Sequence, residues 1–207
     1  MVKNILLDCG GYMGQTIDCF KNTTTYKKNS WQIYSFEAIP ELYNIIRKKH
    51  RDINIINKAV WINNDILNFY KTTIKKQYLK KQNDNSFIYG QGSSLMKSKV
   101  TGSLDKDNPL QIKGLHLSKY IKDNFNKQDN IWLKLDVEGA EYEILEDLIN
   151  SDCIEYIDKL FIEFHYKKIN LDKQIHDNLY NKLKKINTLT IIDEIPGQKT
   201  GDWFRNF

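Results

Sequence analysis

The sequence has few cysteines, few prolines and no long apolar run, and each shortage argues against a class of protein. Its cysteines, Cys9, Cys19 and Cys153, are odd in number and lack C-x-x-C spacing. This pattern argues against a disulfide framework or a zinc site and favours reduced thiols in a cytoplasmic protein. No stretch approaches the roughly 18 apolar residues of a membrane span. The first apolar run meets Asp8 too soon to be a secretory signal peptide.

The chain is only slightly basic. Lys and Arg number 31 against 26 acids, which gives a formal net charge of +5, and the lysines are scattered. The sequence shows no clustered arginines with interleaved aromatic side chains, so we expect no nucleic-acid partner. The length of 207 residues fits one domain, spanning 1–207, with a single hydrophobic core.

Strand-like and helix-like segments alternate along most of the chain. This alternation is typical of an α/β fold with a doubly wound, mostly parallel sheet and helices on both faces. Residues 201–207 follow a Pro196-Gly197 turn and predict an antiparallel last strand, which makes the sheet seven-stranded. The other expected strands are 3–8, 32–37, 54–60, 131–136, 160–165 and 188–195, and the amphipathic segments are 14–22, 40–51, 116–126, 139–150 and 171–187.

Residues from about 71 to 114 interrupt this alternation. The segment is polar and carries the run GQGSS at 90–94. A connection this long inside a compact domain is usually functional or disordered. We therefore expect an insertion over the active face, which acts either as a lid or as a passive loop.

A glycine-rich turn follows the first expected strand and opens a helix. It reads D-x-G-x-x-x-G over Asp8, Gly10 and Gly14, with a second glycine at Gly11. Cys9 stands where the dinucleotide fingerprint G-x-G-x-x-G needs a glycine, and no Walker Gly-Lys-Ser/Thr is present. Glycines let the backbone approach a ligand, a helix N-terminus attracts a carboxylate, and Asp8 can meet an amine. The turn suits the amino-acid half of S-adenosylmethionine (SAM), with an ordinary strand–helix turn as the alternative.

Residues at the ends of the second and third expected strands extend this pattern. Glu37 stands where an acid in doubly wound sheets accepts both ribose hydroxyls. A carboxylate matches a vicinal diol because it offers two acceptor oxygens. We expect Ala38 to border the same ligand, and the apolar Ala59 and Val60 to flank an adenine ring. The alternative is that Glu37 caps the helix that begins near Pro40.

The most specific motif follows in the fourth expected strand, where residues 134–141 read K-L-D-V-E-G-A-E. Together with D-C-G at 8–10, Phe36-Glu37, G-S-S at 92–94 and I-E-F-H at 162–165, it resembles the FkbM family of SAM-dependent O-methyltransferases. The resemblance implies a class I methyltransferase (Rossmann-like) fold, SAM as methyl donor, and a hydroxyl acceptor, often on a sugar or polyketide. Ser94 is expected to contact or cover the donor. The chain departs from the family at Gly11-Tyr12, where Ala-Asn is common.

Charged side chains interrupt two otherwise apolar strands. Lys134 and Asp136 stand in the fourth expected strand, and Glu163 and His165 stand in the fifth. Buried charges are costly unless they are paired, so these residues need a reason. Alternate residues of a strand share a face, and neighbouring strands would bring both pairs to the carboxyl edge of the sheet. That edge is where doubly wound sheets bind ligands.

Two chemical roles remain open for this group. A positioned carboxylate or histidine can take the proton of an attacking hydroxyl, which makes Asp136, His165, Glu163 and Glu138 candidate catalytic residues. Alternatively, Asp136, Glu163 and His165 hold a divalent cation, Mg²⁺ or Mn²⁺, that acidifies the hydroxyl. Lys134 is expected to be structural, in an internal ion pair with Glu163. Glu138 also opens a helix, where an acid meets the helix dipole favourably.

These observations predict a cytoplasmic SAM-dependent O-methyltransferase. Its acceptor would be a small molecule or carbohydrate, most often a sugar or glycan hydroxyl, lying above the fourth and fifth strands. SAM would lie across the ends of the first three. Two other classes remain as alternatives: a nucleic-acid methyltransferase that acts on a ribose 2′-hydroxyl, and a SAM-binding interaction protein without catalysis. The acids on the fourth and fifth strands argue against the last class.

Overall fold

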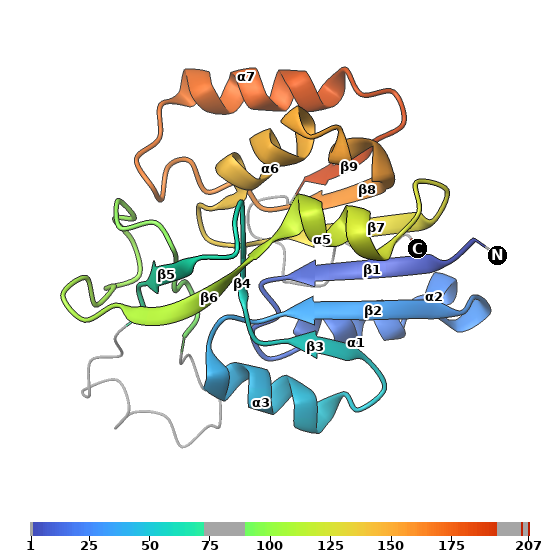
Figure 1. Ribbon diagram of the computed structural model, residues 1–207, viewed down its shortest axis with the longest axis horizontal. Coiled ribbons are helices and arrows are strands. Elements are labelled where there is room, and N and C mark those ends of the chain that lie inside the picture. The colour runs from blue at the N-terminus through green and yellow to red at the C-terminus, as the bar shows by residue number, and fades with distance from the viewer. Residues whose placement is uncertain (1, 73–89, 194–203, 205–206) are drawn as a thin grey trace.

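The computed structural model describes residues 2–72, 90–193, 204 and 207. Within these residues the main sheet has six strands, in the order β3-β2-β1-β7-β8-β9, and every pair is parallel (Figure 1). The strand order reverses between β1 and β7, which is the place where such sheets bind ligands. The strands are β1 Asn4–Cys9, β2 Trp31–Phe36, β3 Asn54–Ile56, β7 Asn130–Leu135, β8 Ile157–Ile162 and β9 Thr190–Asp193.

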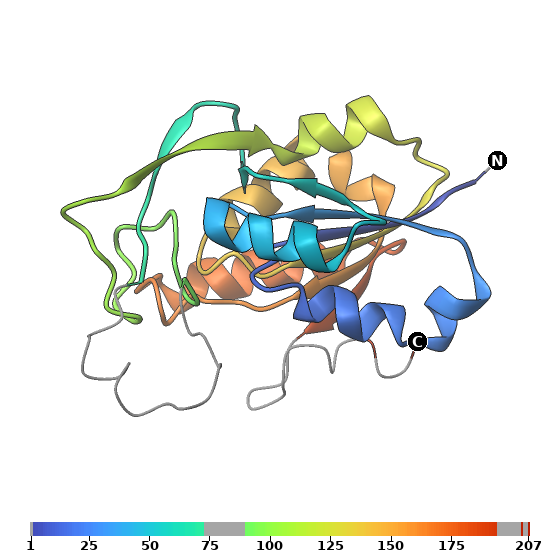
Figure 2. The same ribbon diagram turned by 90° about the horizontal axis from the view of Figure 1, so that it is seen from below.

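Helices cover both faces of this sheet (Figure 2). Leu7 and Leu133 on one face pack in a cluster with α5, α6 and α7. Leu6 and Trp132, the alternate residues, pack on the other face with α1 and α3. The central strands are therefore apolar on both sides, as buried parallel strands must be. The helices are α1 Gln15–Lys21, α2 Thr24–Lys28, α3 Pro40–Lys49, α5 Leu117–Asn124, α6 Glu141–Asn150 and α7 Lys173–Lys184, with a 3₁₀ turn at Cys153–Tyr156.

The α/β, doubly wound prediction is confirmed, but the strand count differs. The expected strand 54–60 is two strands, because the chain leaves the main sheet after Ile56. The amide of Asn57 donates to the backbone carbonyls of Glu37 and Ala38, at 2.8 and 3.1 Å, and holds the chain in a local turn there. The second piece, β4 Ala59–Trp61, joins a separate small sheet.

That small sheet has the order β4-β6-β5 and lies beyond the carboxyl ends of the main strands (Figure 1). Its other strands are β5 Ile66–Phe69 and β6 Leu110–His116. β4 pairs with β6 in parallel, and β5 pairs with it in antiparallel fashion. Residues 110–114, the last part of the expected insertion, therefore belong to a regular strand. The Asn63 carbonyl approaches this strand closely at Gly114.

The expected antiparallel last strand falls largely on residues outside the described ranges, so the seventh strand stays a prediction. Of segment 201–207, the structure places Phe204 and Phe207, which pack against the Phe161 ring at centroid distances of 4.6 and 5.7 Å. Residues 73–89 of the expected insertion likewise lie outside the described residues. Within the part of the chain that is described, no helix has the length and apolar character needed to cross a bilayer.

The end of β1 is fixed by a close approach that admits only glycine. A Cβ on Gly10 would lie 2.0 Å from the Asp136 carbonyl oxygen, and the residue has a φ of 86°. We expect Gly10→Ala to lower the free energy of unfolding by at least about 3 kcal/mol, measured by urea denaturation.

Gly102→Ala is the matched control, because Gly102 has a similar φ of 87° but a Cβ there would make only ordinary van der Waals contacts, the nearest at 3.5 Å. Its cost should be about 1–2 kcal/mol, from the left-handed backbone alone. Equal losses in the two variants would show that the contact with Asp136 does not limit residue size at position 10.

Candidate functional site

A cavity of about 610 Å³ lies at the carboxyl edge of the main sheet, where β1, β2, β7 and β8 end. Its volume is within the range of small-molecule sites, roughly 300–1,000 Å³. Two groups of expected site residues meet in it. The expected donor side supplies Gly10, Gly11, Glu37, Ala38, Ala59 and Val60, and the expected acceptor side supplies Asp136, Glu138 and Glu163.

The glycine turn lies against the end of β2. The backbone N–H groups of Gly10 and Gly11 both donate to the Phe36 carbonyl, at 3.1 and 3.0 Å. A Cβ on Gly11 would lie 2.4 Å from Ser35 Oγ, so the turn is packed directly onto its neighbour. Gly14 caps α1 and does not line the cavity. The turn therefore presents its backbone to the cavity.

Glu37 lies in the wall of the cavity with its carboxylate held at both oxygens. Oε2 accepts from the Tyr12 N–H at 2.7 Å, and Oε1 accepts from the Ile39 N–H at 2.8 Å. Each oxygen keeps a further lone pair for a ligand hydroxyl. Burial raises the pKa of Glu37 to about 7, against the two backbone hydrogen bonds, which lower it, and Asp8 adds to the rise.

Asp8 lies behind the turn and does not line the cavity. The amine that it meets is the protein's own Lys134, where the sequence predicted the amine of a ligand. The Asp8 side chain is fully buried, accepts a hydrogen bond from Ser35 Oγ at 2.9 Å, and lies 3.5 Å from Lys134 Nζ. Lys134 also donates to the Gly10 carbonyl at 2.7 Å and lies 3.5 Å from Asp136. Lys134 therefore pairs with Asp8 and Asp136, where the sequence predicted Glu163, which pairs with Lys168 at 3.0 Å. The contacts of Lys134 join β1 to β7.

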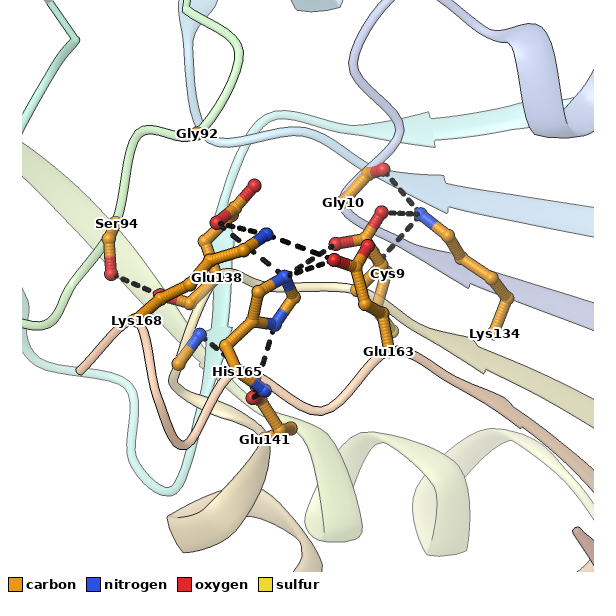
Figure 3. A network of polar contacts seen from close by, with 12 residues as sticks. Cys9, Gly10, Gly92, Ser94, Lys134, Glu138, Glu141, Glu163, His165 and Lys168 are labelled. Carbon is orange, nitrogen blue, oxygen red and sulfur yellow. Dashed lines mark hydrogen bonds and ion pairs between the residues drawn. The ribbon is translucent and has the colours of Figure 1, made fainter. Parts of the chain in front are cut away.

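The acceptor side is a cluster of acids around His165 (Figure 3). His165 Nε2 lies 3.0 Å from Glu163, 3.6 Å from Glu138 and 3.8 Å from Asp136. These carboxylates are about one-fifth to one-quarter exposed, whereas His165 is 1% exposed and does not line the cavity. The expected convergence of strands four and five is therefore found, with the ring beneath the carboxylates.

Glu141 also belongs to this cluster, although no sequence pattern indicated its contacts with His165. It opens α6, but its carboxylate is fully buried instead of facing solvent. Oε1 accepts from the His165 backbone N–H at 2.7 Å and lies 3.2 Å from the ring Nδ1, while Oε2 accepts from the Gly139 N–H at 2.8 Å. It fixes the orientation of the imidazole ring.

The surroundings of the cluster shift the pKa of His165 and the pKa of Asp136 for different reasons. Burial lowers the pKa of His165, but its contacts with Glu141 and Glu163 and the charge of Glu138 outweigh this and raise the pKa to about 10. Burial raises the pKa of Asp136, against Lys134, which lowers it. An Asp136 carboxylate with a raised pKa is a stronger base than an exposed one.

Glu138 is held by the described end of the insertion. Its backbone has a φ of 56°, uncommon for a residue with a side chain. Ser94 Oγ donates to its carbonyl at 2.7 Å, and Lys99 Nζ lies 2.8 Å from its carboxylate and donates to the Gly92 carbonyl. Ser94 is buried and does not line the cavity, although Gly92 and Ser93 do. No sequence pattern pointed to Lys99, or to Lys168, which pairs with Glu163 at 3.0 Å.

The buried ion pairs of Lys134 predict a large stability effect. In Lys134→Met, the fully buried Asp8 keeps a charge without this lysine, which should cost about 3–5 kcal/mol in urea unfolding. Adding Asp8→Asn should restore part of the loss, because the remaining charge is removed while its oxygen still accepts from Ser35. A single variant within about 1 kcal/mol of wild type would contradict the structural role.

Glu37 predicts a pH dependence of stability. With its pKa raised from 4.5 to about 7, the folded protein keeps a proton that the unfolded chain has lost. This contribution is complete below the unfolded pKa and is lost as the pH rises through about 7, a change on the order of 3 kcal/mol. Urea unfolding between pH 5 and 8 should therefore show a flatter profile for Glu37→Gln than for wild type. Parallel profiles would contradict the assignment.

Comparison with known proteins agrees with the motifs in this site. The chain matches the family model of the methyltransferase FkbM domain over residues 8–187. No curated protein gives a significant match. A crystal structure of methyltransferase FkbM from Methylobacillus flagellatus KT is 12% identical with a TM-score of 0.38, and the alignment covers 72% of this chain but 30% of that one, so the chain spans less than a third of that protein. The family model extends over most of the sequence, and the chain belongs to the FkbM methyltransferase family.

Proposed function

We propose that this protein is a SAM-dependent O-methyltransferase whose acceptor is a hydroxyl of a sugar or glycan. The observation that carries the proposal is the shared cavity. It joins a backbone-lined glycine turn and the Glu37 carboxylate on one side to the Asp136, Glu138 and Glu163 carboxylates on the other. A donor and an acceptor bound in these two halves would meet at the topological switch point of the sheet.

The donor half fits the chemistry of SAM. Glu37 presents both oxygens in a fixed orientation, which suits the vicinal hydroxyls of a ribose. Ala59 and Val60 add an apolar border suited to a base, and Gly10 and Gly11 leave room for backbone contacts with the amino-acid end. SAM, when bound, supplies an electrophilic methyl group.

The acceptor half fits an alcohol. Asp136 and Glu163 line the cavity and can accept hydrogen bonds from neighbouring hydroxyls, as a carbohydrate presents them. When a hydroxyl attacks the methyl carbon, the methyl–sulfur bond would break and S-adenosylhomocysteine would leave. The hydroxyl proton would pass to one of these carboxylates, which contributes about 10²–10⁴-fold in rate. We assign His165 to holding the carboxylates, since it lies beneath them.

Two wider features complete the proposal. The described end of the insertion, with Gly92 and Ser93 in the cavity lining, covers the site during transfer. The enzyme acts in the cytoplasm, in keeping with Cys9, Cys19 and Cys153, which form no disulfide.

Removing the charge of Asp136 tests the function. We expect Asp136→Asn to lower S-adenosylhomocysteine formation by about 100-fold or more, because a carboxylate that faces the acceptor loses its charge while the side-chain shape is kept. Turnover is scored across a panel of mono- and oligosaccharides with SAM. Asp177→Asn on α7, an exposed acid paired with Lys173, is the matched control and should keep wild-type activity.

Binding of S-adenosylhomocysteine to Asp136→Asn, measured by calorimetry, should persist because Glu37 is intact. Wild-type turnover in Asp136→Asn would refute the acceptor assignment. A wild-type protein that binds S-adenosylhomocysteine but methylates no member of the panel would refute the proposed acceptor class.

A further inference from the structure

Three side-chain atoms converge at the acceptor end of the cavity in the manner of a metal site. Asp136 Oδ1, Glu138 Oε2 and His165 Nε2 all lie within 4.8 Å of one another. Nε2 is 3.8 Å from the Asp136 oxygen and 3.6 Å from the Glu138 oxygen. A divalent cation bound to each at about 2.1 Å would bring these atoms to about 3 Å from one another, so the two distances from Nε2 would each close by less than about 1 Å. All three residues belong to the part of the chain that the structure describes.

The burial and orientation of His165 give independent support for a metal site. His165 is 1% exposed, and its Nε2 points into the cluster, where it lies 3.0 Å from Glu163 but has no hydrogen bond of good geometry to a described residue. On the opposite edge of the ring, Nδ1 faces the buried Glu141 at 3.2 Å. A histidine that ligates a metal typically donates its other N–H to a carboxylate in this way. This contact holds the ring so that Nε2 faces the carboxylates.

The balance of charge points the same way. Five acids form one connected network with His165, namely Asp8, Asp136, Glu138, Glu141 and Glu163. Three described lysines contact them, Lys99, Lys134 and Lys168. The five acids exceed the three lysines by two formal negative charges, which a protonated His165 reduces to one and which a divalent cation bound at the ring would neutralise in full. Buried charges of one sign are costly, so the network has a strong reason to bind it.

We propose that Asp136, Glu138 and His165 bind a divalent cation of the Mg²⁺ or Mn²⁺ class beside the acceptor hydroxyl. Two carboxylate oxygens favour these metals, and the imidazole nitrogen makes Mn²⁺ the better probe. This inference rests on the proposed methyl transfer for its purpose, since such a cation would acidify the hydroxyl. The ligand set differs from the one expected from sequence, with Glu138 in place of Glu163. Glu163, which lines the cavity, then takes the proton.

Binding of Mn²⁺ to the intact protein is the test, followed by the loss of free Mn²⁺ signal in electron paramagnetic resonance. Wild type should bind one Mn²⁺ per chain. Glu138→Gln should bind at least about tenfold more weakly, because a charged ligand is lost. Glu37→Gln is the matched control, since it removes a buried carboxylate from the donor side of the same cavity and should leave Mn²⁺ affinity within about twofold of wild type.

A second measurement needs no variant. The electron spin echo of the wild-type Mn²⁺ complex should show coupling to the ¹⁴N nucleus of His165. No Mn²⁺ binding at millimolar concentration, equal affinity in Glu138→Gln and wild type, or a bound ion without nitrogen coupling would each overturn the metal site. Methyl transfer that persists at the wild-type rate with EDTA would refute the cation's part in acidifying the hydroxyl while leaving the proposed function standing. Mn²⁺ binding without any transfer would leave the metal site and refute the function.

Discussion

The structure depends on the buried ammonium group of Lys134. Lys134 reaches the Cys9 and Gly10 carbonyls, Asp8 and Asp136, and is 1% exposed. A lysine suits this position because its three donors can serve several acceptors at once. Its contacts, together with the approach of Gly10 to the Asp136 carbonyl, lock the turn after β1 to the end of β7. The two ends of the cavity, which we propose hold the donor and the acceptor, are therefore joined through these contacts.

The charged residues of the motif at 134–141 fall into two groups, those that face the cavity and those that lie behind it. Asp136 and Glu138 face the cavity, while Lys134 and Glu141 lie behind it and hold the glycine turn and His165 in place. Gly139 fits tightly, since a Cβ there would lie 2.2 Å from Ile169. Through Lys99 and Ser94, the described end of the insertion is tied to Glu138. A substitution in that segment would therefore alter the position of the Glu138 carboxylate.

Periodicity predicted the parts of the fold that have regular patterns, and failed where the backbone turns locally. The apolar runs of β1 and β7 and the amphipathic α6 are visible in the sequence because their burial dictates their composition. The exit of the chain at Asn57, which splits one expected strand into two sheets, depends on two side-chain hydrogen bonds that no pattern announces. Asp136 and Glu163 were visible as charges at the ends of apolar runs, and the structure places them just after β7 and β8 end, at Leu135 and Ile162. The partners Glu141, Lys99 and Lys168 were not visible in this way, because acids and lysines near helices and loops are ordinarily solvated.

The central claim is that one cavity holds a methyl donor against Glu37 and an acceptor against Asp136. A crystal structure of the protein with S-adenosylhomocysteine tests it most directly. The account predicts both ribose hydroxyls within hydrogen-bond distance of the Glu37 carboxylate, the amino-acid end at the Gly10-Gly11 turn, and the sulfur facing Asp136 and Glu163. An empty turn, or the nucleoside bound elsewhere with Glu37 facing away from it, would contradict the account.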